Sequence, residues 1–158
     1  MVIFPEIQDF DIEEIMSVNH SRSIQRIGTY LERYNEQFDI LPELEIKLNG
    51  KPLKPDISIY PHLPEDWNTD IIFLTEPPVT AIEILSPRQA MTDITDKMTQ
   101  NYFPSGVKSV WIVIPLLQTL TICTLDGEKI TFSKGVATDP ITHIEIPLNH
   151  IFGKRVRV

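Results

Sequence analysis

The sequence predicts a mixed α/β (or α+β) fold in which a central sheet is flanked by helices. Two segments, 79–85 and 107–114, are apolar on both faces, which is typical of strands covered on both sides of a sheet. A helical segment separates them, and this strand–helix–strand order favours a right-handed crossover with parallel pairing. Strict alternation of apolar and polar residues over 43–48 predicts a further strand with one buried face.

Length and composition indicate an ordinary globular chain. It has 158 residues, of which 42% are hydrophobic and 23% charged, and these proportions argue against disorder and fibrous repeats. We therefore expect a single domain over residues 1–158, with 1–16 as an N-terminal lead-in. Cys123 is the only cysteine, so neither an intrachain disulfide nor a Cys-based zinc site is available.

The charge balance limits the class of partner. The chain has 14 Lys and Arg against 22 Asp and Glu, which gives a formal net charge of −8. This disfavours a protein that coats nucleic acid nonspecifically, but not an enzyme that reaches DNA through a bound metal ion. The N-terminus lacks the regions of a signal peptide, and no apolar run approaches the ~18–20 residues of a membrane helix. We expect a cytoplasmic protein without membrane contact.

An irregular start and one long helix are expected before residue 38. Pro5 and the polar residues around Asp9 disfavour regular structure, and Asp11 is a candidate cap for a short turn over 12–16. Apolar residues then recur at spacings of three and four, which predicts an amphipathic helix over about 19–37. These residues are Ile24, Ile27, Tyr30, Leu31 and Tyr34, with Phe38 beyond them.

A β-hairpin follows the helix. Asn49 and Gly50 tolerate positive φ and form a strong two-residue turn, so we expect a return strand over 54–60. The segment 61–78 contains four of the 13 prolines and is expected to be a loop, in which residues 71–74 pack against the body. The later elements are, in chain order, a helix over 92–103, hairpin strands over 117–125 and 129–132, a short strand around 143–146 and a helical turn over 148–152.

Two acidic residues break the pattern of apolar and polar positions. Glu83 lies in the middle of an apolar strand, where an unpaired charge would cost several kcal/mol. It must therefore be paired, hydrogen-bonded, protonated or bound to a cation. Asp56 follows Pro55 near the start of another strand. Each has a structural alternative, because Lys97 or the backbone alone would satisfy Glu83, and Asp56 could be a turn residue.

Two converging carboxylates would form a hard oxygen site suited to Mg²⁺ or Mn²⁺, ions that polarise a phosphodiester. Lys97, on the helix that follows the Glu83 strand, is the candidate cation for the attacked phosphate. Its alternative is an ordinary helix-surface pair with Asp93, four residues earlier. Glu43 and Glu45 are either solvated strand residues or an additional metal ligand. His20 either begins the first helix or faces the site.

Four segments of the chain resemble one known family. They are KPDISIY, TAIEILSP, DITDKMTQNYFPSGVKSVWIVIP and TDPITHIEIPLNHIF. In order, spacing and flanking residues they resemble the Uma-two family of restriction-endonuclease-like proteins, over roughly residues 20–152. That family is similar to the PD-(D/E)XK nuclease superfamily, which implies a restriction-endonuclease-like core.

The resemblance also implies roles for individual residues. Asp56 and Glu83 would bind Mg²⁺ or Mn²⁺, with a main-chain carbonyl near Ile84 as a candidate third ligand. The superfamily usually has a lysine two residues after the second acid, where this chain has Leu85. In this family the lysine comes from the next helix, and Lys97 matches that place and would position or activate water.

A further acidic residue, in or after the first helix, often completes the site of the superfamily. Glu43 is the first candidate for this position and Glu45 the second.

The function implied by the resemblance is a Mg²⁺-dependent endodeoxyribonuclease that hydrolyses DNA phosphodiesters. The alternative, favoured by Leu85 and the net charge of −8, is a catalytically silent domain that binds DNA or protein. A homodimer is a further expectation, because nucleases of this fold often work as dimers. The expected DNA contacts are the basic residues nearest to the site in sequence, Lys47, Lys51, Lys54 and Arg88.

Overall fold

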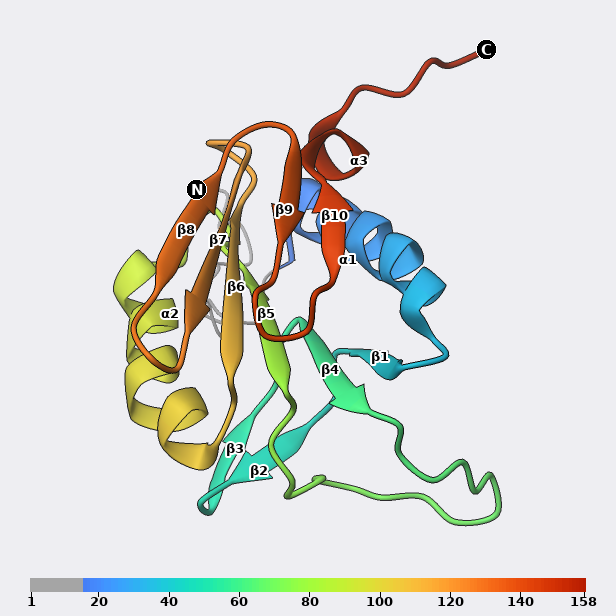
Figure 1. The fold of residues 1–158 in the computed structure, drawn as a ribbon, viewed down its shortest axis with the longest axis vertical. Coiled ribbons are helices and arrows are strands. Elements are labelled where there is room, and N and C mark those ends of the chain that lie inside the picture. Colours follow the sequence, from blue (N-terminus) through green and yellow to red (C-terminus); the bar gives the residue numbers. More distant parts are fainter. Residues whose placement is uncertain (1–15) are drawn as a thin grey trace, which may run out of the picture.

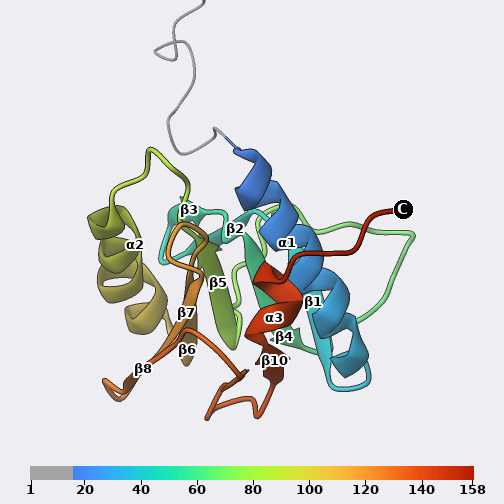
Figure 2. The same cartoon turned by 90° about the horizontal axis from the view of Figure 1, so that it is seen from above.

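The structure is a computed structural model that describes residues 16–158. The expected lead-in over 1–16, including the turn capped by Asp11, lies outside the described residues except for Met16. Helices and one large sheet form the described part (Figure 1). Seen from above, the sheet lies between α1 on one side and α2 on the other (Figure 2). The predicted mixed fold with flanking helices is confirmed.

The main sheet has six strands in the order β1-β4-β5-β6-β7-β8. The pair β5–β6 is parallel and every other neighbouring pair is antiparallel, so the predicted parallel pairing of the two buried strands is confirmed. The strands are β1 (Phe38–Pro42), β4 (Ile57–Pro61), β5 (Thr80–Ile84), β6 (Ser109–Ile114), β7 (Thr119–Thr124) and β8 (Lys129–Phe132). All five residues of β5 are buried, as expected of a central strand.

The predicted first helix is correct in position but too long. Ser17 caps α1 (Val18–Leu31) by accepting the N–H of His20, and the helix continues only into the 3₁₀ turn η3 (Glu32–Tyr34). Phe38, which fits the helical spacing, instead begins β1, a strand that was not predicted. Its partner, β4, lies far along the chain, so pairing across the sheet decides the structure of this segment.

The predicted hairpin has the correct turn but the wrong return strand. Asn49 and Gly50 both have positive φ, 50° and 81°, and connect β2 (Ile46–Leu48) to β3 (Lys51–Leu53). The segment expected to return, 54–60, instead leaves this small sheet and contributes β4 to the main sheet. Pro55 lies between the two strands, and its missing N–H removes a donor that a continuous strand would need.

Two further predictions are wrong: the residue at which the first strand starts, and the packing of residues 71–74. The ladder begins only at Ile46, because Glu43 turns with φ of 54° and donates its N–H to the carbonyl of Asp56. In the long loop after β4, Ile71, Ile72 and Phe73 are exposed. Only Leu74 packs down, where it forms a parallel bridge with Ile46.

The second helix is irregular at its end. It comprises α2 (Met91–Lys97), a π-helical segment η4 (Met98–Tyr102) and a 3₁₀ turn η5 (Phe103–Ser105). Gly106 ends it with φ of 102°, a left-handed conformation that favours glycine. The helix expected over 92–103 is therefore confirmed, although not as one uniform α-helix.

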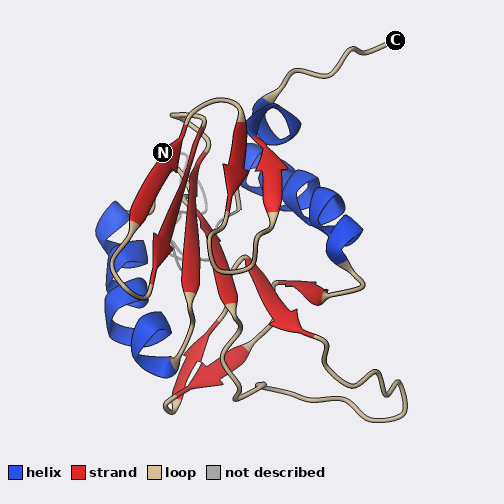
Figure 3. Cartoon of the chain, viewed as in Figure 1, coloured by secondary structure: helices blue, strands red, loops and turns tan. Residues whose placement is uncertain are grey.

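The C-terminal elements lie mostly where they were predicted. The hairpin of β7 and β8 turns over Asp126 and Gly127, and α3 (Leu148–Phe152) is the predicted helical turn. The short strand is β10 (Glu145–Pro147), and its partner β9 (Val136–Thr138) was not predicted. Figure 3 shows this separate two-stranded sheet beside the main sheet.

The main sheet separates two apolar cores. One core lies under α1 and α3 and includes Ile27, Ile57, Ile82 and Trp111. The other lies under α2 and includes Ile94, Met98, Ala81 and Ile112. Adjacent residues of β5 and β6 alternate between these cores, which explains why both strands are apolar on both faces. Among the described residues, no helix is both long and apolar enough to span a membrane.

Candidate active site

The antiparallel pair β4–β5 brings the two predicted carboxylates to one place. Ile57 lies opposite Ile82, so Asp56, just before β4, and Glu83, just after Ile82, reach the same part of the ladder. Both side chains are buried, with 7% of Asp56 and 3% of Glu83 exposed. Neither carboxylate is therefore an ordinary surface group, and each needs polar partners.

Asp56 is held by the backbone and by one side chain. The N–H of Ile84 donates to Asp56 Oδ2 at 2.6 Å, and Nε2 of His20 lies 3.1 Å from Oδ1. Burial opposes protonation of His20, but the hydrogen bond and charge of Asp56, with the charges of Glu83 and Glu43, outweigh it. The pKa of His20 is consequently raised above its usual value.

Glu83 is oriented by a residue of the second helix. The hydroxyl of Tyr102 donates to Oε1 of Glu83 in a buried contact. Tyr102 ends the π-helical segment η4, and its side chain is fully buried. Nothing in the sequence indicates that the hydroxyl of Tyr102 contacts a site residue.

The two carboxylates line a cleft with a volume of about 450 Å³. His20 and Lys97 line the same cleft, so four of the predicted site residues come together there. Of the two weaker acidic candidates, Glu45 lines the cleft, whereas Glu43 lies at the exposed turn before β2. The other polar residues at the cleft are Lys51, Lys54, Ser86, Gln89, Asp93, Asp96, Gln100 and Asn101.

The basic residues expected near DNA separate into two groups. Lys51 and Lys54 line the cleft, because the β2–β3 hairpin forms one of its walls. Lys47 and Arg88 are exposed and do not line it. The polar residues that the sequence did not point to, such as Asn101 and Gln100, lie in η4, directly after Lys97. Their spacing of three and four residues from Lys97 was the available signal.

The donors in the cleft fit a hard divalent cation. Among residues 16–158 there is no group of three or more His, Cys, Asp or Glu side chains arranged to hold a metal ion. The two carboxylates alone still match the needs of Mg²⁺, which usually keeps several water molecules and takes one or two protein carboxylates. The cleft is large enough for such waters.

Cys123 does not belong to the site. It lies on β7 in the core under α2 and is buried. Burial raises the pKa of its thiol, against a smaller opposing effect of Lys129. It is therefore a packing residue and not an activated thiolate.

Comparisons with known proteins give a consistent result. The Uma2 family model, described as "Putative restriction endonuclease", matches residues 10–143. No curated protein matches the chain. One similar solved structure is that of "a putative nuclease belonging to DUF820" from Anabaena variabilis ATCC 29413. It has a TM-score of 0.72 and 23% sequence identity, and the match covers 87% of this chain and 82% of the other.

Proposed function

The chain belongs to the Uma2 family, and from this premise we propose that it is a divalent-metal-dependent endodeoxyribonuclease. The observation that carries the proposal is the convergence of two buried carboxylates, Asp56 and Glu83, in one cleft with Lys97. The family description and the nuclease title of the similar structure support the reaction class.

Asp56 and Glu83 are the residues that would hold the cation. When bound, Mg²⁺ or Mn²⁺ would supply a Lewis acid for the phosphodiester and lower the pKa of a water. The Ile84 N–H and His20 fix Asp56, and the hydroxyl of Tyr102 fixes Glu83, so both carboxylates are held in position before a ligand binds. This preorganisation reduces the reorganisation that catalysis would otherwise require.

Lys97 would orient the attacking water or stabilise the charge that develops on the phosphate. The usual lysine position of the superfamily is Leu85 in this chain, on β5. Because Lys97 lines the same cleft from α2, a lysine from the helix can act on the same phosphate. The departure from the usual spacing is thus compatible with the proposed chemistry.

The alternative is a catalytically silent member that binds DNA or protein through the same fold. Leu85 and the net charge of −8 favour it, as does the small number of potential ligands among the described residues. A cleavage assay distinguishes the two functions. Only the nuclease would cleave DNA, and it would need a divalent cation to do so.

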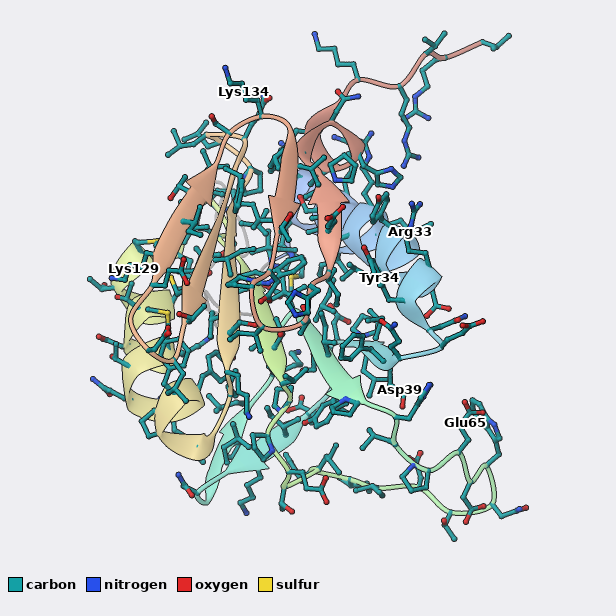
Figure 4. All side chains as sticks on the ribbon, in the orientation of Figure 1. Arg33, Tyr34, Asp39, Glu65, Lys129 and Lys134 are labelled. Atoms are coloured by element: carbon teal, nitrogen blue, oxygen red, sulfur yellow. The ribbon has the colours of Figure 1, made fainter. Side chains whose placement is uncertain are left out.

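The test is cleavage of supercoiled plasmid and linear duplex with Mg²⁺, with Mn²⁺ and with EDTA. We expect cleavage only with a metal, and a loss of roughly 10²–10³-fold in Asp56→Asn, Glu83→Gln and Lys97→Ala. Glu65→Gln is the matched control, because Glu65 is exposed in the long loop after β4 (Figure 4) and does not line the cleft. Cleavage in EDTA, or active-site variants as active as the control, would refute the proposal.

Metal binding provides a readout besides activity. Mn²⁺ is expected to raise the midpoint of thermal unfolding of the wild type and of Glu65→Gln, but not of Asp56→Asn. If no variant or wild-type protein cleaves DNA while duplex binding persists without metal, the silent alternative is correct.

A further inference from the structure

A second pocket lies against α1 and is lined by other residues of this helix than the cleft is. Its volume is about 180 Å³, and Asn19, Arg22, Ser23 and Arg26 of α1 form one wall. The opposite wall is the end of α3 and the segment after it, up to Lys154. Figure 2 shows α3 and the C-terminal segment lying across α1. The pocket is too small for a large organic ligand, but it has room for one anionic group.

Arg26 is a buried cation that forms part of this wall. Only 7% of the residue is exposed. Its Nη1 donates to the main-chain carbonyls of Ile151 and Gly153 at 2.8 and 2.9 Å. A guanidinium has five N–H donors, so these two bonds fix its orientation and leave further donors for a ligand.

Within residues 16–158, the pocket has cationic side chains in its lining but no acidic one. Arg22 Nη1 donates to the neutral Oδ1 of Asn19 at 2.8 Å, and no Asp or Glu lines the pocket among the residues described. Burial lowers the pKa of Arg26, and the charges of Arg155, Arg22 and Arg157 lower it further. Clustered cations with a partly buried member are costly unless an anion joins them.

We propose that this pocket binds a phosphate of the DNA backbone, on a strand that continues into the active-site cleft. Arg is suited to this role because its planar fork matches the oxygens of phosphate. The inference rests on the proposed function, which puts DNA in the cleft.

The geometry of α1 fits one continuous strand. His20 lines the cleft and Arg26 lines the pocket, six residues later on the same helix. At about 1.5 Å per residue this is a rise of roughly 9 Å along the helix axis, and the two side chains also point about 120° apart around the helix, so the sites are at least this far apart. One strand of duplex DNA carries a phosphate about every 3.4 Å of its axis, so the pocket would take a phosphate a few nucleotides from the cleaved bond.

The test is duplex binding by the double variant Arg22→Ala/Lys154→Ala. Both residues are exposed and hold no structural hydrogen bond to the backbone, so the fold should persist. The matched control is Lys129→Ala/Lys134→Ala, which removes the same charge from β8 and the following loop (Figure 4). Fluorescence anisotropy with a labelled duplex in EDTA measures binding without cleavage.

We expect the pocket variant to bind the duplex about tenfold more weakly, with a salt dependence reduced by roughly one unit of slope. The control should bind like the wild type. Equal weakening in both double variants would indicate only a net-charge effect and would overturn the proposal. So would unchanged binding by the pocket variant, or a wild type that binds no duplex.

Inorganic phosphate distinguishes a free-anion site from a DNA contact. Phosphate should raise the unfolding midpoint of the wild type more than that of the pocket variant. If the variant loses this stabilisation but keeps full duplex affinity, the pocket takes free phosphate and the proposal is wrong. Because binding is measured without metal, its outcome is separate from that of the cleavage assay. Failed cleavage in the wild type counts against the proposed function, whereas unchanged binding by the pocket variant counts against this inference alone.

Discussion

At the residue scale, the described part of the chain contains three buried carboxylates with different surroundings. Asp56 and Glu83 face the cleft, whereas Asp139 is fully buried away from it. Asp139 Oδ2 accepts bonds from the hydroxyl of Ser109 at 2.7 Å and the indole N–H of Trp111 at 2.8 Å. Its Oδ1 accepts the N–H of Ile141 at 2.7 Å. Asp139 therefore joins β6 to the segment before β10, and its role is structural.

We expect Asp139→Ala to lower the free energy of unfolding by about 3 kcal/mol or more, because several buried donors lose their acceptor together. Urea unfolding followed by circular dichroism measures the change. Asp70→Ala is the control, since Asp70 is exposed in the long loop and should change stability by less than about 0.5 kcal/mol. A loss below about 1 kcal/mol in Asp139→Ala would contradict this account.

The sequence identified some of these residues more readily than others. Glu83 was recognisable because it interrupts an apolar strand, and that signal is local. Asp139 lies between short strands without a pattern, so its burial could not be predicted. For His20 two alternatives were open: a residue that begins the first helix, or a side chain that faces the site. The structure places Nε2 of His20 3.1 Å from Oδ1 of Asp56, so the side chain faces the site.

At the element scale, the β2–β3 hairpin supplies Lys51 and Lys54 to the cleft, and its turn depends on two residues with positive φ. Gly50→Val would place a β-branched residue at φ of 81°. We expect a loss of about 1–2 kcal/mol from this strain. Urea unfolding measures it, and a variant as stable as the wild type would show that the turn is not strained.

Gly28→Ala is the matched glycine replacement, with the opposite expected sign. Gly28 lies within α1, and an added Cβ would meet no atom within 4 Å. Alanine should therefore stabilise the protein by about 0.5–1 kcal/mol through its higher helix propensity. Destabilisation by Gly28→Ala would contradict the described packing of α1.

Long, strongly patterned elements were predictable, and short ones with distant partners were not. The strands β5 and β6, with the helix between them, follow from local patterns alone. By contrast, β1 and β9 were not predicted; β1 pairs with β4, and β9 pairs with the predicted strand β10 across a loop. Propensity is weak in such short strands, so their pairing partners decide their conformation.

At the scale of the whole molecule, β5 and β6 contribute to both apolar cores. We therefore propose that the described residues unfold as one cooperative unit, consistent with the single domain expected from length. Trp111 lies on β6, the strand between β5 and β7, and is fully buried, whereas Trp67 is 94% exposed. In a Trp67→Phe variant the tryptophan fluorescence would thus come from Trp111 alone and would report on the core.

In that variant, the fluorescence of Trp111 and the far-UV circular dichroism should change at the same urea concentration. Two separated midpoints would show that the two sides of the sheet unfold independently.

Assembly into a homodimer stays a prediction. Nucleases of this fold often cleave duplex DNA as dimers, and analytical ultracentrifugation would measure whether this chain forms one.

Net charge is also a property of the whole molecule, and the structure changes how it is interpreted. The value of −8 remains unfavourable for nonspecific DNA binding. However, some basic residues lie where the proposed DNA contacts would form: Lys51, Lys54 and Lys97 line the cleft beside its acidic residues, and Arg22, Arg26 and Lys154 line the second pocket. Local cations of this kind can contact a few phosphates while the rest of the surface repels DNA.

The sequence by itself determined the fold class, the central parallel pair of strands, the family and the identity of the strongest acidic candidates. The fold class, the parallel pair and the unusual position of Glu83 follow from burial periodicity and local turn chemistry, which each residue and its near neighbours carry. The family follows instead from the resemblance of four segments to known members. Only the tertiary structure decided that Asp56, Glu83, Lys97 and His20 line one cleft, and that Arg22, Arg26 and Lys154 line another pocket. Such convergence depends on strand register and helix docking between distant segments, which no local pattern specifies.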